Sequence, residues 1–286
     1  MNHGIDGESG PFSGRLSSPA AIPVLGIPTG LGLRLDAAAR ENAAFEVRLK
    51  INAAAGERST RNVIAERGAR DRPLLIVGAH LDSVSEGPGM NDNASGSAAV
   101  LEAALRLGKE PDAPPAIRFA FWGAEERGLL GSRHHLDAMG EDERKRISLY
   151  VNLDMVGSPN AGRFLNLMQE PNSEPAASMA RALTEWFAER GLPLEQRARR
   201  PRGFGSDDSS FAAKGIPTVS LFTGAGETKS QAHAEQFGGS AGQPFDPCYH
   251  KACDTAQNID REVLSQITDA LADALRRKGQ PTGSPD

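Results

Sequence analysis

The chain has 286 residues, a formal net charge of −5, 39% hydrophobic residues and 24% charged residues. These values are typical of a folded globular protein, and the length allows one large α/β domain or two small ones. The sequence has neither the basic stripe of a nucleic-acid-binding protein nor an apolar run as long as a membrane span, so we expect neither partner. The first residues, MNHGIDGESG, lack the basic and apolar regions of a signal peptide, which indicates a cytosolic chain or a mature form.

The N-terminal part of the chain shows little hydrophobic periodicity. Proline and glycine interrupt the apolar segment Ala20–Arg34, which we expect to form a strand fragment and a loop. Leu35–Ala44 has the composition of one short helix. Apolar and charged residues alternate from Phe45 to Ile51, and this pattern predicts a half-buried strand.

From residue 62 onwards, predicted strands alternate with predicted helices. The strands are expected at Asn62–Glu66, Leu74–Ala79, Ile117–Phe121, Leu149–Leu153 and Thr218–Phe222. The helices are expected at Ser95–Leu107, Glu125–Met139, Ser178–Arg190 and Val263–Leu275. Continuous apolar strands suit a sheet that is covered on both faces. The sequence therefore predicts an α/β fold with an open, mostly parallel (mixed) twisted sheet and helices on both faces.

Acidic residues or a histidine follow three of these strands. His80 and Asp82 come after the second strand, Glu125 and Glu126 after the third, and Asp154 after the fourth. In open α/β sheets the ligand site lies outside the carboxyl ends of the strands. Each residue alone has a simpler explanation, such as a solvated helix face or a helix cap. Their shared placement favours a metal site.

Two further residues complete the candidate set. Asp92 lies in a polar turn that follows a Gly- and Pro-bearing loop, and His250 lies in the turn-like stretch PCYHKACDT. Taken alone, each is explained as an ordinary loop residue. Zinc accepts imidazole and carboxylate ligands at neutral pH, and two neighbouring zinc ions need one bridging carboxylate. One histidine and one acid then remain for each ion.

Two further acids are left for supporting roles once the zinc ligands are counted. Glu125 is not needed as a ligand, so it is available as a general base that takes a proton from water. Asp82 is suited to orient the imidazole of His80.

The two cysteines, Cys248 and Cys253, flank His250. One interpretation is a pair of unrelated reduced thiols. The spacing favours a second interpretation, a local disulfide that fixes the histidine and indicates an oxidising compartment. A zinc finger is excluded, because it needs a second cysteine pair.

Several segments resemble the M28 family of zinc aminopeptidases, and most closely the secreted streptomycete aminopeptidase S type. The matching motifs are GAHLDSV (Gly78–Val84), GPGMNDNASGS (Gly87–Ser97), RFAFWGAEERGLLGS (Arg118–Ser132), LYVNLDMVGSPN (Leu149–Asn160), GIPTVSLFTGA (Gly215–Ala225) and DPCYHKACDT (Asp246–Thr255). The resemblance implies a zinc-exopeptidase-like catalytic domain at residues 46–279, a remnant of a protease-associated insert domain at residues 1–45, and a frayed tail at residues 280–286.

The resemblance also implies how the metal ligands are shared. His80, Asp92 and Asp154 would hold one Zn²⁺. Asp92, Glu126 and His250 would hold the other. Ca²⁺ is kept as a further metal candidate.

Other site features are implied in the same way. Glu125 would be the base and proton shuttle, and Tyr249 would hydrogen-bond the developing oxyanion. The Cys248–Cys253 disulfide, an extracellular location and a cis peptide bond after Asp92 are also implied.

The implied activity is release of N-terminal, large apolar residues from peptides with a free α-amine, by attack of a metal-bridging hydroxide. We expect a monomer. Candidate walls of the apolar pocket are Met155, Phe204, Phe211 and Phe222, each of which is also explained as a core residue. One departure concerns substrate binding: the position that carries arginine in close relatives is Gly205 here.

Three alternative functions stay open at this point. The first is a related metallo-exopeptidase that acts on dipeptides or on C-terminal residues. The second is a non-catalytic M28-like binding module. The third is a one-zinc acyl transferase of the glutaminyl cyclase type.

Overall fold

The computed structural model describes residues 22, 24–42, 44–50, 57–110, 116–167, 173–198 and 205–279. The chain divides into two compact units, residues 1–58 and 59–286. Among the described helices, none combines the length and the apolar character that crossing a membrane requires. The assignment of residues 1–45 to a remnant of an insert domain stays a prediction.

The first unit differs from the expectation in two places. Helix α1 spans Thr29–Glu41, so the loop predicted up to Arg34 is wrong for residues 29–34, where the helix has already begun after Pro28. The predicted half-buried strand is wrong for residues 45–50, which form no strand, while Val47 and Leu49 are 60% and 50% exposed. Ile51 lies outside the described residues. Alternation forms a stable strand only when a neighbouring strand pairs with it.

The second unit contains a seven-stranded mixed sheet in the order β1-β3-β2-β4-β7-β5-β6. The strands are β1 (Val63–Arg67), β2 (Leu74–His80), β3 (Ala116–Trp122), β4 (Ile147–Leu153), β5 (Phe164–Leu167), β6 (Glu195–Ala198) and β7 (Thr218–Phe222). The neighbours β3, β2, β4 and β7 run parallel, whereas the β1–β3 and β5–β7 pairs are antiparallel. The predicted open, mostly parallel sheet is confirmed.

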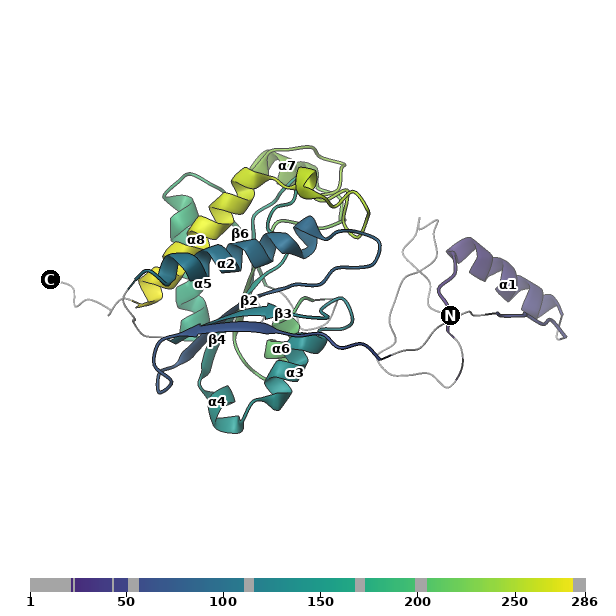
Figure 1. Ribbon diagram of the computed structural model, residues 1–286. Coiled ribbons are helices and arrows are strands. Elements are labelled where there is room, and N and C mark those ends of the chain that lie inside the picture. The colour runs from purple at the N-terminus through teal and green to yellow at the C-terminus, as the bar shows by residue number, and fades with distance from the viewer. Residues whose placement is uncertain are drawn as a thin grey trace. The chain divides into compact units, whose positions relative to one another are not determined.

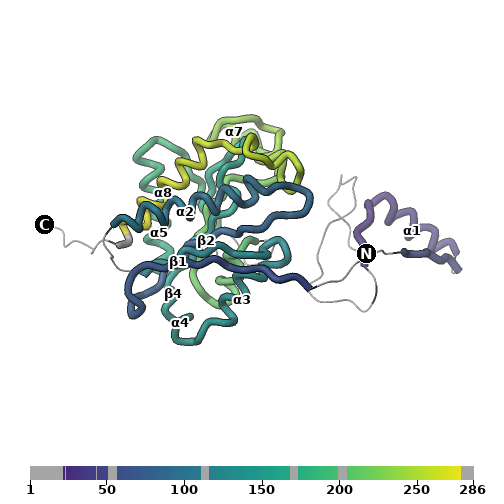
Figure 2. Tube along the Cα trace, viewed as in Figure 1, coloured from purple at the N-terminus to yellow at the C-terminus, as the bar shows by residue number. Residues whose placement is uncertain are grey.

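Helices cover both faces of this sheet (Figures 1 and 2). They are α2 (Gly96–Leu107), α3 (Leu130–Ala138), α4 (Glu141–Lys145), α5 (Glu174–Ala188), α6 (Asp208–Ala212), α7 (Gln231–Phe237) and α8 (Arg261–Gly279). Figure 1 shows α2, α5 and α8 on one face and α3, α4 and α6 on the other. Two short turns complete the unit, η1 (Met90–Ser95) and η2 (Ala256–Asn258).

The central strand β2 shows why its sequence is apolar throughout. All seven of its residues are buried. Leu75 and Val77 belong to the core beneath α2, α5 and α8, whereas Leu74 and Ile76 belong to the core on the opposite face. Successive side chains of a strand point to opposite faces, so burial on both sides requires an unbroken apolar run. Such a strand fixes the position of the residue at its carboxyl end.

Gly78 is required in β2 by close packing on one face of the sheet. A Cβ atom there would lie 2.6 Å from Trp122 Nε1 and 2.7 Å from the hydroxyl oxygen of Tyr150. Trp122 donates a hydrogen bond to that hydroxyl, and the hydroxyl donates one to Asn152. Tyr150 also stacks on Phe211 with ring centroids 3.8 Å apart. This polar and aromatic layer lies directly behind the carboxyl ends of the strands.

The outer edge of the sheet at β1 is little covered in the described part of the chain. Four of the five β1 residues are exposed, including Val63 at 54% and Ile64 at 37%. Its one paired neighbour in the sheet is β3.

Candidate metal centre

Adjacent strands bring three of the predicted site segments to one edge of the sheet. His80 is the last residue of β2 and lies opposite Trp122, the last residue of β3. Glu125 and Glu126 follow β3 after a short turn. Asp154 is the residue immediately after β4, the other neighbour of β2. The carboxyl ends of β2, β3 and β4 therefore bring these residues together.

Asp92 enters from the irregular turn η1. The peptide bond between Asp92 and Asn93 is cis, as expected. The Asn93 side chain fixes the turn, because it donates to the carbonyl of Leu153 at 2.9 Å and accepts the backbone N–H groups of Gly96 and Met155. Asp92 is consequently held beside the end of β4.

The two oxygens of Asp92 face two different histidines. Oδ1 lies 3.2 Å from His80 Nε2, and Oδ2 lies 3.0 Å from His250 Nε2. His80 Nε2 is also 3.5 Å from Asp154 Oδ1, and His250 Nε2 is 3.2 Å from Glu126 Oε1. Asp92 is thus the member that two clusters share.

We name the clusters by their supports. The sheet-borne group is His80, Asp92 and Asp154, and the loop-borne group is Asp92, Glu126 and His250. Within each group the candidate ligand atoms all lie within 4.8 Å of one another. These are the two sets that the resemblance implies.

Asp82 contacts both His80 and the turn of Glu125 and Glu126, and the second of these contacts was not predicted from the sequence. Its backbone carbonyl, not its carboxylate, is the nearer partner of His80 Nδ1, at 2.9 Å against 3.7 Å. Its carboxylate accepts the backbone N–H groups of Glu125 and Glu126 at 2.9 and 3.2 Å. One residue therefore orients the imidazole and also fixes the turn that carries both glutamates.

His250 comes from a loop rather than from a strand end. Cys248 and Cys253 form a disulfide across this loop, which confirms the local-disulfide interpretation. His250 has a backbone φ of 56°, in the left-handed region that few non-glycine residues adopt. The ring of Tyr249 stacks on the imidazole at a centroid distance of 3.9 Å. The loop thus presents an imidazole and a phenol side by side.

The pKa values reflect how closely these groups are packed. Burial of Asp92 opposes ionisation, but hydrogen bonds from His250 and His80 outweigh it and lower the pKa of Asp92 to about 2. Burial lowers the pKa of His250, yet its bonds to Asp92 and Glu126 raise that pKa to about 10. Burial raises the pKa of Glu125 to about 9, and His80 opposes this rise. Cations are therefore favoured at this end of the sheet.

The donor set fits zinc. Each group combines one imidazole with two carboxylates, and zinc accepts both kinds of ligand. Calcium binds carboxylate oxygens but does not favour the imidazole nitrogen. Asp154 Oδ1 is buried and has no hydrogen-bond partner within the described ranges, although it faces His80 Nε2. An acceptor left in this state costs free energy unless a cation or a proton compensates it.

Two of the four predicted apolar pocket residues are buried. Phe211 is fully buried in the core, where it stacks on Tyr150. Met155 is also buried. Phe222 is half-buried with its ring 6.2 Å from that of Phe164, and Phe204 lies outside the described residues.

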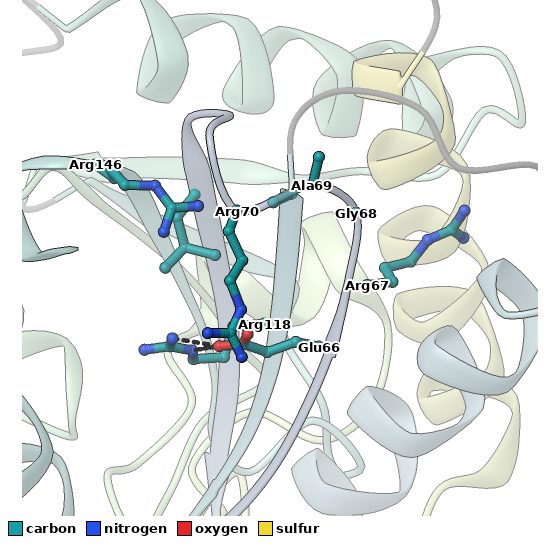
Figure 3. A pocket seen from close by; sticks show the side chains of 9 residues that line it. Glu66, Arg67, Gly68, Ala69, Arg70, Arg118 and Arg146 are labelled. Atoms are coloured by element: carbon teal, nitrogen blue, oxygen red, sulfur yellow. Dashed lines mark hydrogen bonds and ion pairs between the residues drawn. The ribbon is translucent and has the colours of Figure 1, made fainter.

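A small hollow occurs at the opposite, amino ends of β2 and β3. Figure 3 shows Arg70, Arg118 and Arg146 around it together with Glu66. The guanidinium group of Arg118 forms ion pairs with Glu66 and Glu143, and Arg146 donates to the backbone carbonyl of Arg72. Since internal partners occupy Arg118 and Arg146, we assign no ligand to the hollow.

Comparison with known proteins gives a consistent family match. The profile of peptidase family M28 matches residues 62–275. The chain is 38% identical over 273 residues to "Probable lipoprotein aminopeptidase LpqL" of Mycobacterium tuberculosis, covering 93% of this chain and 54% of that protein. It is 41% identical over 227 residues to "Leupeptin-inactivating enzyme 1" of Streptomyces exfoliatus, covering 78% of this chain and 50% of that protein.

A solved structure shares the fold. The zinc aminopeptidase BSAP from Bacillus subtilis superposes with a TM-score of 0.63 and 29% identity, covering 78% of this chain and 51% of that chain. The present chain therefore spans about half the length of these relatives.

Proposed function

The chain belongs to peptidase family M28, and from that premise we propose that it is a two-zinc aminopeptidase. Its substrates would be peptides with a free N-terminus and a large apolar first residue. One observation carries the proposal. The two oxygens of Asp92 face the imidazoles of His80 and His250 at 3.2 and 3.0 Å, so that one carboxylate serves two groups.

The five candidate ligands divide the work of holding the metal. His80 and Asp154 would complete one site, Glu126 and His250 the other, and Asp92 would contribute to both. When bound, zinc polarises a carbonyl group as a Lewis acid and lowers the pKa of water.

Glu125 is proposed as the proton carrier. It follows β3 beside the ligand Glu126, and its backbone N–H donates a hydrogen bond to Asp82 Oδ1 at 2.9 Å. Cations held by the neighbouring carboxylates favour its ionised form, so it can take a proton from water and deliver it to the leaving amine. Together with Asp154 it also offers negative charge to the α-ammonium group of a peptide.

Tyr249 is proposed as a hydrogen-bond donor to the oxygen that gains negative charge. Burial and the nearby carboxylate of Asp92 raise the pKa of its phenol, so the hydroxyl keeps its proton at neutral pH. A preorganised donor at such a position stabilises the transition state more than the substrate.

The proposal extends to location and assembly. The Cys248–Cys253 disulfide is typical of an oxidising, extracellular compartment, and we propose that the protein acts there as a monomer. The apolar first-residue preference and a role for Ca²⁺ stay predictions.

The test measures zinc content and hydrolysis of leucine anilide for the wild type and for Glu125→Ala. We expect about two zinc ions per chain in both proteins, and a fall in kcat of about 10²- to 10⁴-fold in the variant, because general-base catalysis is lost. N-acetyl-leucine anilide is the matched control. Equal hydrolysis of the blocked substrate would contradict an aminopeptidase, and near-normal activity of the variant would contradict the role of Glu125.

A further inference from the structure

Three site-bearing loops meet at four buried polar side chains, which we call the loop junction: Asn91, Asp246, Asp254 and Asn258. Their exposed fractions are 0%, 1%, 1% and 8%. Asn91 immediately precedes the shared carboxylate of Asp92, and the other three lie in the segment around His250. The junction therefore lies next to the candidate ligands Asp92 and His250 in the chain, and it contains none of the ligands itself.

Asp254 joins the loop of Asp92 to the loop of His250. Its Oδ1 accepts the backbone N–H of Asn91 at 2.8 Å, and its Oδ2 accepts the backbone N–H of Asp92 at 3.1 Å. Its backbone carbonyl accepts the N–H of Met90 at 3.2 Å. Three consecutive N–H groups of one loop therefore end on one residue, which is 162 positions from Asp92 in the sequence.

Asp254 is itself held from the other side. Its backbone N–H donates to the carbonyl of Lys251 at 3.0 Å, within the His250 loop. The residue before it, Cys253, is tied to Cys248 by the disulfide. The amide of Asn258 donates to Asp254 Oδ1 at 3.2 Å. Asp254 is thus held in place within the His250 loop by hydrogen bonds to Lys251 and Asn258 and by the neighbouring disulfide.

The third loop joins through Asn91. Its side-chain oxygen accepts the backbone N–H of Gly157 at 3.1 Å. Its side-chain amide donates to Ser158 Oγ at 3.1 Å and to Asp246 Oδ2 at 2.7 Å. Gly157 and Ser158 lie shortly after Asp154, so the sheet-borne group is tied to the same junction.

We propose that Asp254 is a positioning residue, which sets where the shared carboxylate of Asp92 lies relative to His250. The inference rests on the proposed two-zinc function and adds a residue that touches no substrate and no metal. It predicts that Asp254 controls metal affinity through the backbone of residues 90–92.

The chemistry of the contact requires a carboxylate. Two neighbouring backbone N–H groups converge on two acceptor oxygens. The side-chain NH₂ group of an asparagine at this position would face one of these two N–H donors and could not accept a hydrogen bond from it. A buried N–H without an acceptor costs free energy, so the backbone of residues 91 and 92 would move to find another partner. Because one of the donors is the N–H of Asp92 itself, the shift falls on the shared ligand.

The test compares Asp254→Asn with the wild type and with a matched control, Asp260→Ala. Asp260 caps α8 by accepting the N–H of Val263 at 3.0 Å, so its loss removes one negative charge and lowers stability without touching residues 90–92. Zinc affinity is measured by competition with a chromophoric chelator. The visible absorption of Co²⁺-loaded protein reports the coordination geometry, and unfolding of the metal-free proteins reports stability.

We expect Asp254→Asn to weaken zinc binding by about 10- to 100-fold and to change the Co²⁺ spectrum. Asp260→Ala should match the wild type in both measurements although it unfolds more easily. Wild-type affinity and spectrum in Asp254→Asn would overturn the inference. A wild-type protein that binds no zinc would overturn the proposed function and this inference with it.

A second variant keeps the inference testable if Asp254→Asn does not fold. Asn258→Ala removes the amide that donates to both Asp246 and Asp254. A smaller loss of zinc affinity in the same direction supports the inference, and unchanged affinity in that variant counts against it.

Discussion

The sheet-borne and loop-borne groups offer the same donor chemistry on different supports. In the sheet-borne group, the side chain of His80 is 1% exposed and that of Asp154 is 19% exposed. In the loop-borne group, the side chain of His250 is 36% exposed and that of Glu126 is 11% exposed. One group is set by the ends of two buried strands, whereas the other depends on a disulfide-closed loop.

The difference shows how one site can combine rigidity with access. Burial of β2 on both faces fixes His80 through packing, which many residues share. His250 depends on local links, namely the disulfide, the stacked ring of Tyr249 and the loop junction. The more exposed imidazole is therefore the one whose position rests on a few specific contacts.

The largest expected effect comes from removing the residue that both groups share. Asp92→Ala takes a ligand from each group, so we expect zinc content to fall from about two ions per chain to about none. Hydrolysis of leucine anilide should fall by at least about 10³-fold, because Lewis-acid catalysis is lost. Metal analysis after dialysis checks this result. Retention of one tightly bound zinc ion would show that the groups do not depend on a common carboxylate.

Removing one histidine from each group tests the comparison directly. We expect His80→Ala and His250→Ala each to keep about one zinc ion per chain. The metal-free proteins should differ in stability. His80→Ala should lose about 2–4 kcal/mol of unfolding free energy, because it empties a buried site and leaves buried carboxylates uncompensated. His250→Ala should lose less, about 1–2 kcal/mol, because His80 still faces the shared carboxylate of Asp92. Equal losses in urea unfolding would contradict the assignment of different supports.

Opening the disulfide should affect the loop-borne group selectively. Cys253→Ser removes a short covalent loop, which contributes about 2 kcal/mol in a chain-entropy estimate. We expect the affinity for one of the two zinc ions to fall by about 10-fold and the affinity for the other, which shares only Asp92 with this loop, to fall less. Stepwise zinc titration with a chelator measures both affinities, with Cys248→Ser as the matched variant. An equal loss at both sites would mean that the disulfide supports the whole site.

The smallest expected effect on metal binding belongs to Tyr249→Phe. The variant keeps the ring that stacks on His250 and loses the hydroxyl, so zinc content and affinity should not change. The value of kcat should fall by about 10²-fold with little change in KM, because the donor acts in the transition state. A changed zinc affinity would show that Tyr249 supports the loop rather than the reaction.

The sheet and the order of the site residues were predictable because strong local patterns encode them. The apolar run at Leu74–Ala79 and the five-residue run at Thr218–Phe222 appear as strands with nearly the same bounds. β5 and β6 were missed, since each has four residues and β6, with the sequence EQRA, has no apolar pattern. The helix predicted from Glu125 begins only at Leu130, because Leu129 has a φ of 60°.

The loop junction could not be predicted, because its contacts join distant parts of the chain. Asp254 lies inside the quoted motif DPCYHKACDT, yet nothing in that motif shows that its carboxylate binds a loop 163 positions earlier. The orienting role of Asp82 towards His80 was predicted, but its second role was hidden in the same way, since its carboxylate accepts from residues 43 and 44 positions away.

The exposed strand β1 has a consequence for handling the protein. Backbone donors and acceptors on an open sheet edge can pair with a strand from another molecule, and exposed Val63 and Ile64 add an apolar surface to that edge. Charged residues occur only at the far end of the strand, in Glu66 and Arg67. Concentrated solutions of the protein should therefore form sheet-to-sheet aggregates while the metal centre is still intact.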